Sequence, residues 1–320
     1  MLGAMYIEPP AARGIVRPTE AEVRAALSRC RPELARATLR YIGEGWASWA
    51  FETRGIVLRF PKLREAVDGF AVERRLLPAL APVLPVRVPE PVFYCEDGPN
   101  GLPFAGARYV PGVTPQELRR PASLRFAADA GRLLRVLHSF PPDEAAGLGL
   151  PVDDGAVVRR RESACYEDVV RRVFPLISCE ARSYCEAEFE AYLNEPANFA
   201  FEPRLVHNDL DQRNTVLDPE TGDLVGLVDF GDARIGDPAA DFVWLLTIGL
   251  RDLGIDGQAG ALLRAYDPAR RIEELQSRID FYYFGWPLGD ILHGLDLGDE
   301  EFVAEGIRSL NARVLFGTRC

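Results

Sequence analysis

The 320-residue chain is poor in lysine and histidine, and it lacks the patterns of zinc sites, secretion signals and membrane spans. Lys62 is its only lysine, so arginine carries almost all of the positive charge. Its six cysteines stand at positions 30, 95, 165, 179, 185 and 320. They form no Cys-X-X-Cys pair and have no histidine at zinc-ligand spacing, so we expect reduced thiols. No basic segment followed by an apolar stretch opens the chain, and no apolar run approaches bilayer length, which predicts a cytoplasmic protein.

An excess of positive charge is also missing. The formal net charge is -11, which excludes nucleic acid and anionic membrane surfaces as main partners, because both reward basic patches. An acidic chain suits a cationic substrate, but acidity also serves solubility and therefore does not identify one. With 48% hydrophobic residues and no internal repeat, the chain is long enough for a substantial core in two domains.

The most informative feature is a pair of polar segments, His207–Asn214 and Val228–Asp232. Phosphoryl transfer needs one carboxylate to orient and deprotonate a hydroxyl, and oxygen ligands that hold Mg²⁺ against nucleotide phosphates. Asp209 suits the first role, and Asn214 and Asp229 suit the second. Each residue alone is better explained as a loop cap or a solvated carboxylate, but the ordered set predicts a kinase.

The spacer between the two segments predicts a β-hairpin. Residues 215–228 contain two short apolar runs around a cluster of proline, glycine and aspartate. Because a hairpin returns the chain to its start, we expect Asp229 to lie beside Asn214. Their hard oxygen atoms suit Mg²⁺.

The N-terminal part is predicted to be a small antiparallel sheet with one main helix. Thr19 and Glu22 form a capping-box pattern that opens a first helix, which Arg31-Pro32 ends. The expected strands cover residues 39–42, 49–53, 55–60, 92–95 and 104–110, and the main helix covers 65–80. The composition then turns helical at Pro111-Gly112, which predicts a domain boundary.

A nucleotide needs a covering loop and a cation beside its phosphates, and the N-terminal part offers both. The loop Gly43–Ser48, with Gly45 and Ser48, is expected to present backbone N–H groups to the phosphates, although any tight turn uses glycines. Arg59 is the best placed cation and is expected to pair with Glu73. Lys62 is the competing candidate, disfavoured because Pro61 interrupts the strand before it.

The C-terminal part is predicted to be mostly helical. Thr114–Glu117 resembles a second capping box, with proline at the first helical position. Further helices are expected over residues 123–140, 164–174 and 180–193, and from 237 onward. His138 is expected to be a hydrogen-bonded core histidine and not a ligand.

Asp237 and Pro238 are predicted to open a helix that follows the second polar segment. Asp241 then lies in the first turn, where a carboxylate also interacts favourably with the helix dipole. We favour a role in binding the backbone around His207 and holding the catalytic loop. His207 itself is expected to pack and hydrogen-bond structurally.

These segments resemble the aminoglycoside phosphotransferase family, within the protein-kinase-like superfamily, and most closely the aminoglycoside 2''-phosphotransferases. The motifs that carry the resemblance are Leu205–Asp209, Gly226–Ala233, Asp237–Phe242, Leu58–Lys62 and Phe104–Gly106. The similarity runs from about Tyr41 to Phe242 and is much less specific beyond it.

The resemblance implies an α+β, two-lobe protein-kinase-like fold: a nucleotide-binding N-terminal lobe (residues 1–110) and a larger, mostly helical lobe (111–320) for catalysis and substrate. It implies ATP or GTP as phosphate donor with Mg²⁺. We expect a monomer, although one sequence does not determine the oligomeric state. Asp209 would be the catalytic base, and Asn214 and Asp229 the metal ligands. Arg108 and Val110 would present hinge backbone groups to the purine.

Two departures from the family bear on function. The family commonly has lysine where Arg59 stands, and arginine keeps the charge but not the geometry. The family's resistance enzymes hold cationic sugars with acidic residues after the second metal motif, whereas residues 242–250 here are apolar. Most of the later carboxylates are expected on a solvated face. These are Asp290, Asp296, Asp299, Glu300 and Glu301.

We therefore expect an ATP- or GTP-dependent kinase that phosphorylates a hydroxyl of an aminoglycoside antibiotic. A kinase of another small molecule (a macrolide, an amino alcohol or a metabolite) is the alternative, and a flatter apolar site around Trp244 and Trp286 would favour it. A nucleotide-binding pseudokinase is the third hypothesis. It is disfavoured because a pseudokinase has no physical need for Asp209, Asn214 and Asp229 together.

Overall fold

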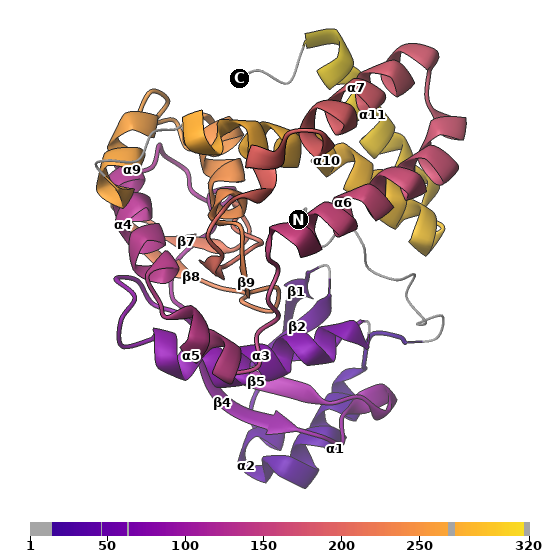
Figure 1. Ribbon diagram of the computed structural model, residues 1–320. Helices are drawn as coiled ribbons and strands as arrows, with labels where there is room; N and C mark the ends of the chain where they lie inside the picture. The colour runs from indigo at the N-terminus through magenta and orange to yellow at the C-terminus, as the bar shows by residue number, and fades with distance from the viewer. Residues whose placement is uncertain (1–14, 46, 63, 268–272, 317–320) are drawn as a thin grey trace. The chain divides into compact units, whose positions relative to one another are not determined.

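The structure, a computed structural model, describes residues 15–45, 47–62, 64–267 and 273–316, and the chain forms two compact units (Figure 1). The N-terminal unit consists of Pro10–Gly112 and, from later in the chain, Val225–Gly231. The C-terminal unit contains Val113–Leu224 and Asp232–Cys320. The predicted boundary after residue 110 lies two residues from the observed one, but the prediction assigned Val225–Gly231 to the other part. The nucleotide and substrate roles of the two parts remain predictions.

The N-terminal unit is built on a five-stranded antiparallel sheet with the strand order β1-β2-β3-β5-β4. Its strands are β1 (Arg40–Glu44), β2 (Ser48–Thr53), β3 (Ile56–Pro61), β4 (Glu90–Cys95) and β5 (Phe104–Arg108). Its helices are α1 (Glu20–Cys30), α2 (Pro32–Ala35), α3 (Glu65–Leu80) and the short η2 (Pro99–Gly101). This confirms the expected sheet with one main helix.

Local sequence signals set the start and end of the first helix. The Thr19 hydroxyl accepts a hydrogen bond from the Glu22 N–H, and the Glu22 carboxylate accepts one from the Thr19 N–H at 2.7 Å, which completes the predicted capping box. Pro32 ends α1 and opens α2, as expected.

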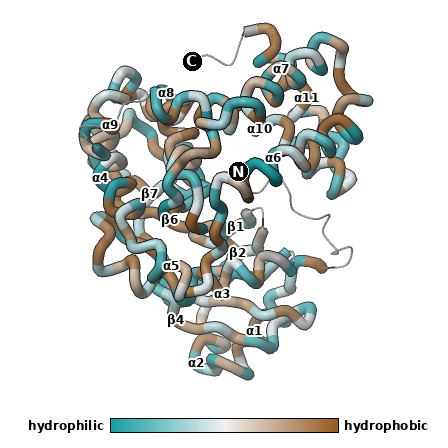
Figure 2. The backbone as a smooth tube through the Cα atoms, viewed as in Figure 1, coloured by the Kyte–Doolittle hydropathy of each residue, from teal (hydrophilic) through white to brown (hydrophobic). Residues whose placement is uncertain are grey.

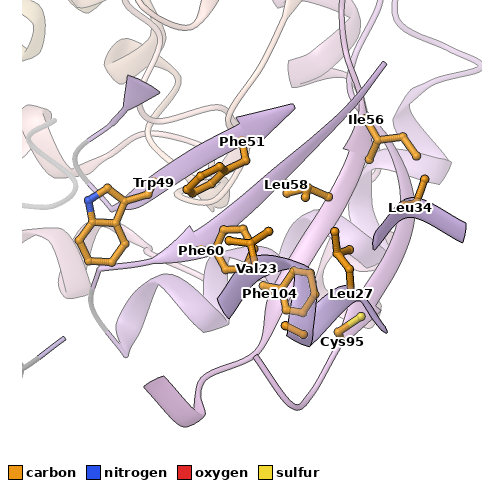
Figure 3. Packing of buried hydrophobic residues seen from close by; sticks show 11 residues of the cluster. Val23, Leu27, Leu34, Trp49, Phe51, Ile56, Leu58, Phe60, Cys95 and Phe104 are labelled. Atoms are coloured by element: carbon orange, nitrogen blue, oxygen red, sulfur yellow. The ribbon is translucent and has the colours of Figure 1, made fainter. Parts of the chain in front are cut away.

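Apolar residues of α1 and the sheet form the core of the N-terminal unit. Val23 and Leu27 of α1 pack against Leu58 and Phe104 of the sheet, and all four are buried (Figure 3). Phe60 stacks on Phe104 with ring centroids 4.8 Å apart. Helix α1 therefore covers one face of the sheet and completes the hydrophobic core there.

One sequence prediction fails in this unit. Cys30, which ends α1, and Cys95, which ends β4, form a disulfide, although they are 65 residues apart in the sequence. Reduced thiols were expected because no short cysteine spacing suggested a pair. The pairing depends on α1 packing against β4's side of the sheet, which cysteine spacing does not encode.

The C-terminal unit is mostly helical. Its longer helices are α4 (Phe126–His138), α5 (Pro142–Gly147), α6 (Gly155–Asp168), α7 (Cys179–Leu193), α9 (Ala259–Tyr266), α10 (Glu273–Leu297) and α11 (Glu300–Phe316). Shorter turns are η3 (Val169–Val173), η4 (Phe174–Leu176), η5 (Pro196–Phe199), η6 (Pro238–Phe242), η7 (Leu245–Gly249) and α8 (Leu250–Asp252). Figure 1 shows α4 beside α9, and α10 and α11 packed with α7.

Two small sheets complete this architecture. β6 (Arg204–Val206) pairs with β9 (Arg234–Gly236), and β7 (Thr215–Leu217) pairs with β8 (Leu224–Leu227). The second pair is the predicted hairpin. It is also where the chain leaves the C-terminal unit for the first time, because Val225–Gly231 belongs to the N-terminal unit and the C-terminal unit resumes at Asp232.

The helix predicted from Thr114–Glu117 does not form. The Glu117 carboxylate accepts hydrogen bonds from the Thr114 N–H at 2.9 Å and the Thr114 hydroxyl at 3.0 Å, but the segment is only a turn. Pro121 explains the failure, since it disfavours helical backbone at the residue before it and leaves too few residues for a helix.

Both hydrophilic and hydrophobic residues occur along the helices of each unit (Figure 2). In α4 the buried residues include Phe126, Ala130, Leu133 and Leu137, the spacing of a helix with one buried face. Within the described residues, no helix has both the length and the apolar character needed to cross a membrane.

Candidate active site

The loop between β6 and β7 carries the predicted catalytic residue. Asn208 adopts the left-handed conformation with a φ of 67°, which asparagine tolerates better than most residues. The next residue, Asp209, is half-buried, and its N–H donates to Nδ1 of His207 at 3.3 Å. His207 is fully buried, in line with the structural role expected for it.

Asp209 and Asn214 are brought together by this loop. The Asn214 amide nitrogen donates to the Asp209 carboxylate at 2.8 Å and to the Asp209 carbonyl at 2.7 Å. Burial raises the pKa of the Asp209 carboxyl, and the neighbouring carboxylates of Asp211 and Asp232 raise it further. A carboxylate with a raised pKa is a stronger proton acceptor than an exposed aspartate, as a general base requires.

Asp241 of η6 holds the backbone of this loop, as predicted. Its Oδ2 accepts from the His207 N–H at 2.9 Å, and its Oδ1 accepts from the Asn208 N–H at 2.8 Å. The capping of the segment is also confirmed, because the Asp237 carboxylate accepts from the Ala239 N–H at 3.0 Å. The segment itself is a 3₁₀ turn followed by a π turn, where an ordinary helix was expected.

The carboxylate of one residue, Asp218, stabilises the turn of the hairpin that follows Asn214. Oδ1 of Asp218 accepts from the Glu220 N–H at 2.9 Å and the Thr221 N–H at 2.8 Å. The chain then runs through β8 to Asp229, which has a φ of 64°. An aspartate in the left-handed region is strained, and such strain clusters at functional sites.

In the N-terminal unit, three charged side chains from separate segments form one network, in which Arg59 and Glu73 are largely buried and Asp229 is exposed. Arg59 on β3 pairs with Glu73 on α3, and its Nη1 donates to Oδ1 of Asp229 at 2.9 Å. The other oxygen of Glu73 accepts from the Phe230 N–H at 2.9 Å. The predicted pairing of Arg59 with Glu73 is therefore present, and it extends to the backbone beside Asp229.

Burial and charge compete in this network. Burial opposes the charge on Arg59, but the carboxylates of Glu73 and Asp229 outweigh it and raise the pKa of the guanidinium. Burial raises the pKa of the Glu73 carboxyl to about 7, although Arg59 and the Phe230 N–H partly offset this. The network forms only because α3 approaches closely: a Cβ at Gly69 would lie 3.1 Å from the Gly231 Cα.

The Glu73 pKa gives a test based on pH. Its value in the folded protein, about 7, lies above its ordinary value of 4.5, so folding takes up a proton between them. The stability that this group contributes is complete below the lower value and is lost as pH rises through the higher one. We expect the free energy of unfolding of the wild type to fall relative to Glu73→Gln between pH 5 and pH 8, by at most about 1.4 kcal/mol per pH unit.

Denaturant unfolding of both proteins across this range measures the difference. Glutamine does not titrate, so its profile provides the reference. Parallel profiles for the two proteins would contradict the raised pKa.

Lys62, the competing cation, has a different partner. Its Nζ lies 2.7 Å from Oε2 of Glu44, the last residue of β1, directly before the predicted phosphate loop. In the same loop the Gly45 N–H donates to the Ser48 carbonyl at 2.9 Å, and Trp46 lies outside the described residues. The geometry thus separates the two cations, because only Arg59 contacts Glu73 and Asp229.

The two predicted hinge residues lie at the end of β5 and just after it. Arg108 is the last residue of β5, and its side chain pairs with Glu90 at 3.0 Å. Val110 follows with its side chain buried. Binding of their backbone groups to a purine stays a prediction.

The C-terminal unit contains a cavity of about 410 Å³ beside Asp209. Its lining comes from the catalytic loop, α6, β9, the segment from η6 to η7, α10 and α11. Trp244 and Trp286 both line it, together with Val243 and Ile248. A cavity of this size next to a candidate base is suited to a small molecule.

Most charges in the cavity wall neutralise one another. Asp153 accepts from Arg161 at 2.6 Å and from Arg234 at 3.0 Å. Asp211 likewise pairs with Arg213 at 2.5 Å. These pairs leave little net charge on their side of the cavity.

Two carboxylates of the wall are different. Asp290 on α10 and Glu305 on α11 form no direct ion pair among the described residues, although the charges of Arg213 and Arg313 act on the Asp290 carboxylate. Burial raises the pKa of the Asp290 carboxyl. Together they are the part of the wall that would attract a cationic group.

Most of the late carboxylates were expected on a solvated face, and Asp290 and Asp296 are the exceptions. Asp290 lines the cavity, whereas Asp296 pairs with Arg172 at 2.5 Å and Asp299 caps α11 through the Phe302 N–H. Glu300 and Glu301 are exposed, as expected. Asp153 and Arg161 were not singled out at all, because no local pattern distinguishes them from surface charges.

The predicted metal ligands offer suitable atoms. The Asn214 nitrogen is used by Asp209, which leaves the amide oxygen for a cation, and Asp229 keeps one carboxylate oxygen beyond the one that Arg59 contacts. An amide oxygen and a carboxylate are hard ligands of the kind that Mg²⁺ prefers. Asn214 belongs to the C-terminal unit and Asp229 to the N-terminal unit, so each offers a donor of the right kind and their joint binding of Mg²⁺ remains a prediction.

The model of the phosphotransferase enzyme family (APH) matches residues 38–276. The uncharacterized protein YcbJ of Bacillus subtilis (strain 168) is 24% identical over 266 residues, covering 79% of this chain and 82% of the relative.

Solved structures of phosphotransferases have a similar fold. The GDP and kanamycin complex of APH(2")-IIia has 27% sequence identity and a TM-score of 0.81, covering 92% of this chain and 98% of that chain. Macrolide 2'-phosphotransferase MphH from Brachybacterium faecium has 23% identity and a TM-score of 0.68, covering 92% and 98%, and shows the fold alone. The chain belongs to the phosphotransferase enzyme family and is a small-molecule kinase with a protein-kinase-like fold.

Proposed function

We propose that this kinase transfers the γ-phosphoryl group of ATP or GTP to a hydroxyl of an aminoglycoside. The observation that carries the proposal is the cavity beside Asp209, whose wall contains the carboxylates of Asp290 and Glu305. An aminoglycoside has several ammonium groups and many hydroxyls, so it fits both features. The similarity to the kanamycin complex of APH(2")-IIia supports the same acceptor class.

In this mechanism Asp209 orients the acceptor hydroxyl and accepts its proton. Asn214 holds the carboxylate in place through its amide nitrogen. Arg59, fixed by Glu73, stabilises negative charge on the phosphates. Asn214 and Asp229 would supply oxygen ligands to Mg²⁺, which neutralises phosphate charge when bound.

The loop with Gly45 and Ser48 would cover the phosphates with its backbone N–H groups. Arg108 and Val110 would offer backbone groups to the purine. Both contributions belong to the proposal, as does the choice between ATP and GTP.

A second acceptor class is favoured by the tryptophans of the cavity. Trp244 and Trp286 lie in its lining, next to Val243 and Ile248. This apolar wall suits the less charged surface of a macrolide or of another metabolite alcohol. The alternative keeps the same chemistry at Asp209 and changes only the acceptor.

Phosphate transfer by the purified protein tests the proposal directly. ATP and GTP are supplied separately with a panel of aminoglycosides, macrolides and simple amino alcohols, and mass spectrometry detects the phosphorylated product. We expect transfer to at least one aminoglycoside. Transfer to macrolides alone would replace the acceptor assignment, and no transfer to any acceptor would overturn the proposed reaction.

The carboxylates of the cavity give a sharper prediction. Asp290→Asn is expected to raise KM for a polycationic acceptor such as kanamycin about tenfold, because a hydrogen bond to a charged group is lost. KM for the nucleotide is expected to stay unchanged. Steady-state kinetics with each substrate varied in turn measures both.

Asp299→Asn is the matched control, since Asp299 caps α11 and does not line the cavity. It should leave both KM values near those of the wild type. An equal effect of the two substitutions would contradict a cation-binding role for Asp290.

A further inference from the structure

We infer that Arg213 determines the charge selectivity of the acceptor cavity, an inference that rests on the proposed function. This residue lies on the catalytic loop and lines the same cavity as Asp209. The carboxylates of Asp211 and Asp290 line the cavity too. The Arg213 guanidinium is therefore a cation that the protein itself places among the carboxylates that attract a cationic acceptor, and it competes with the acceptor for them.

Hydrogen bonds within the loop hold this guanidinium at the cavity wall. The Arg213 N–H donates to Oδ1 of Asp211 at 2.7 Å, and Nε of Arg213 donates to Oδ2 at 2.8 Å. Nη2 donates to the same Oδ2. Backbone and side chain of Arg213 thus bind one carboxylate, which leaves Asp211 with no charge to offer a ligand.

Arg213 also acts on the carboxylate of Asp290, which lies on α10. Burial raises the pKa of the Asp290 carboxyl, and the charges of Arg213 and Arg313 partly offset this rise. The same positive charge that favours ionised Asp290 repels any other cation that approaches it. An acceptor therefore gains less from each ammonium group than the wall carboxylates alone would give.

The other two arginines of the cavity lining have a different environment. Arg161 and Arg234 both bind Asp153, and Arg161 also binds Glu162 at 3.1 Å. Their side chains are only 17% exposed, whereas that of Arg213 is 47% exposed. Among the described lining residues, Arg213 is thus the arginine whose partner carboxylates a ligand can most readily share.

Replacing Arg213 by glutamine tests this role. We expect the Kd of kanamycin, measured by calorimetric titration without nucleotide, to fall about threefold to fivefold, the size of effect of a half-exposed charge. The same change is expected for spermine, a polycation that is not a sugar. The gain should disappear at about 1 M salt, because screening suppresses interactions between exposed charges.

Two control variants separate local charge from net charge and from loop structure. Arg213→Lys keeps the charge and should bind kanamycin as the wild type does, within about twofold. Arg204→Gln removes the same charge from β6, where Arg204 pairs with Glu202 outside the cavity lining, and should leave the Kd unchanged. Equal gains for Arg213→Gln and Arg204→Gln, or for Arg213→Gln and Arg213→Lys, would overturn the inference.

The binding measurement does not depend on catalysis. If no acceptor is phosphorylated but Arg213→Gln binds kanamycin more tightly than the wild type, the proposed reaction fails and the role of Arg213 stands. If aminoglycosides are phosphorylated and Arg213→Gln leaves the Kd unchanged or raises it, the inference fails and the proposed function stands. Binding of neither polycation to either protein also overturns the inference.

Discussion

Replacing Asp209 by asparagine is expected to lower kcat for phosphate transfer by about 100- to 10,000-fold, the usual contribution of a general base. Asparagine keeps the size of the side chain but cannot accept the hydroxyl proton. Nucleotide binding should survive, because Arg59, Glu73 and Asp229 belong to the other unit and are not altered. Steady-state kinetics and calorimetric titration with nucleotide measure the two quantities.

The pH profile of the wild type provides a second readout. Because burial raises the pKa of Asp209, activity should fall on the acidic side at a pH above the ordinary range of an aspartate. Asp299→Asn is a useful control, since Asp299 caps α11 and does not line the cavity beside Asp209. Undiminished transfer by Asp209→Asn would overturn the assignment of the base.

Replacing Arg59 by glutamine is expected to lower kcat/KM for the nucleotide by about 100- to 1,000-fold, as for loss of one preorganised donor to developing charge. Lys62→Gln is expected to change it only a few-fold. The two cations are three residues apart, but Arg59 contacts Glu73 and Asp229, whereas Lys62 contacts Glu44. Comparison of the two variants therefore decides which of the two cations interacts with the nucleotide phosphates.

Stability must be measured beside activity for this pair. Loss of Arg59 leaves Glu73 buried without its cation, a change that strongly destabilises folded proteins. Unfolding curves at the assay pH show whether Arg59→Gln is still folded during the assay. Arg59→Lys keeps the charge but not the fork that reaches two carboxylates, so it should lie between the wild type and glutamine. An equal or larger loss for Lys62→Gln would reverse the assignment.

The parts of the site that sequence predicted well share one property: neighbouring residues fix them. The hairpin between Asn214 and Asp229 follows from turn residues within a short apolar spacer. The caps at Thr19 and Asp237 follow from residues two or three positions apart. The contact of Asp241 with His207 was predicted from motif order and is confirmed.

The wrong predictions depend on packing between distant segments. Cys30 and Cys95 are joined because α1 lies against the sheet that β4 closes. Most of the late carboxylates were expected to be solvated, and Asp290 is an exception because α10 places it in the wall of a cavity. At Thr114–Glu117 the wrong prediction has a local cause instead. The predicted hydrogen bond between Thr114 and Glu117 forms, but Pro121 prevents the helix from continuing.

The sequence by itself determined the reaction class, because Asp209, Asn214 and Asp229 have a fixed order and spacing that follow from local backbone geometry. Tertiary structure decided which cation joins the network, what holds the catalytic loop, and which carboxylates face the cavity. These depend on side chains from helices and strands far apart in the chain, such as Arg59 with Glu73 and His138 with Asp241. Such contacts arise only when the elements pack, since the hydrophobic faces that bring them together specify no single polar partner.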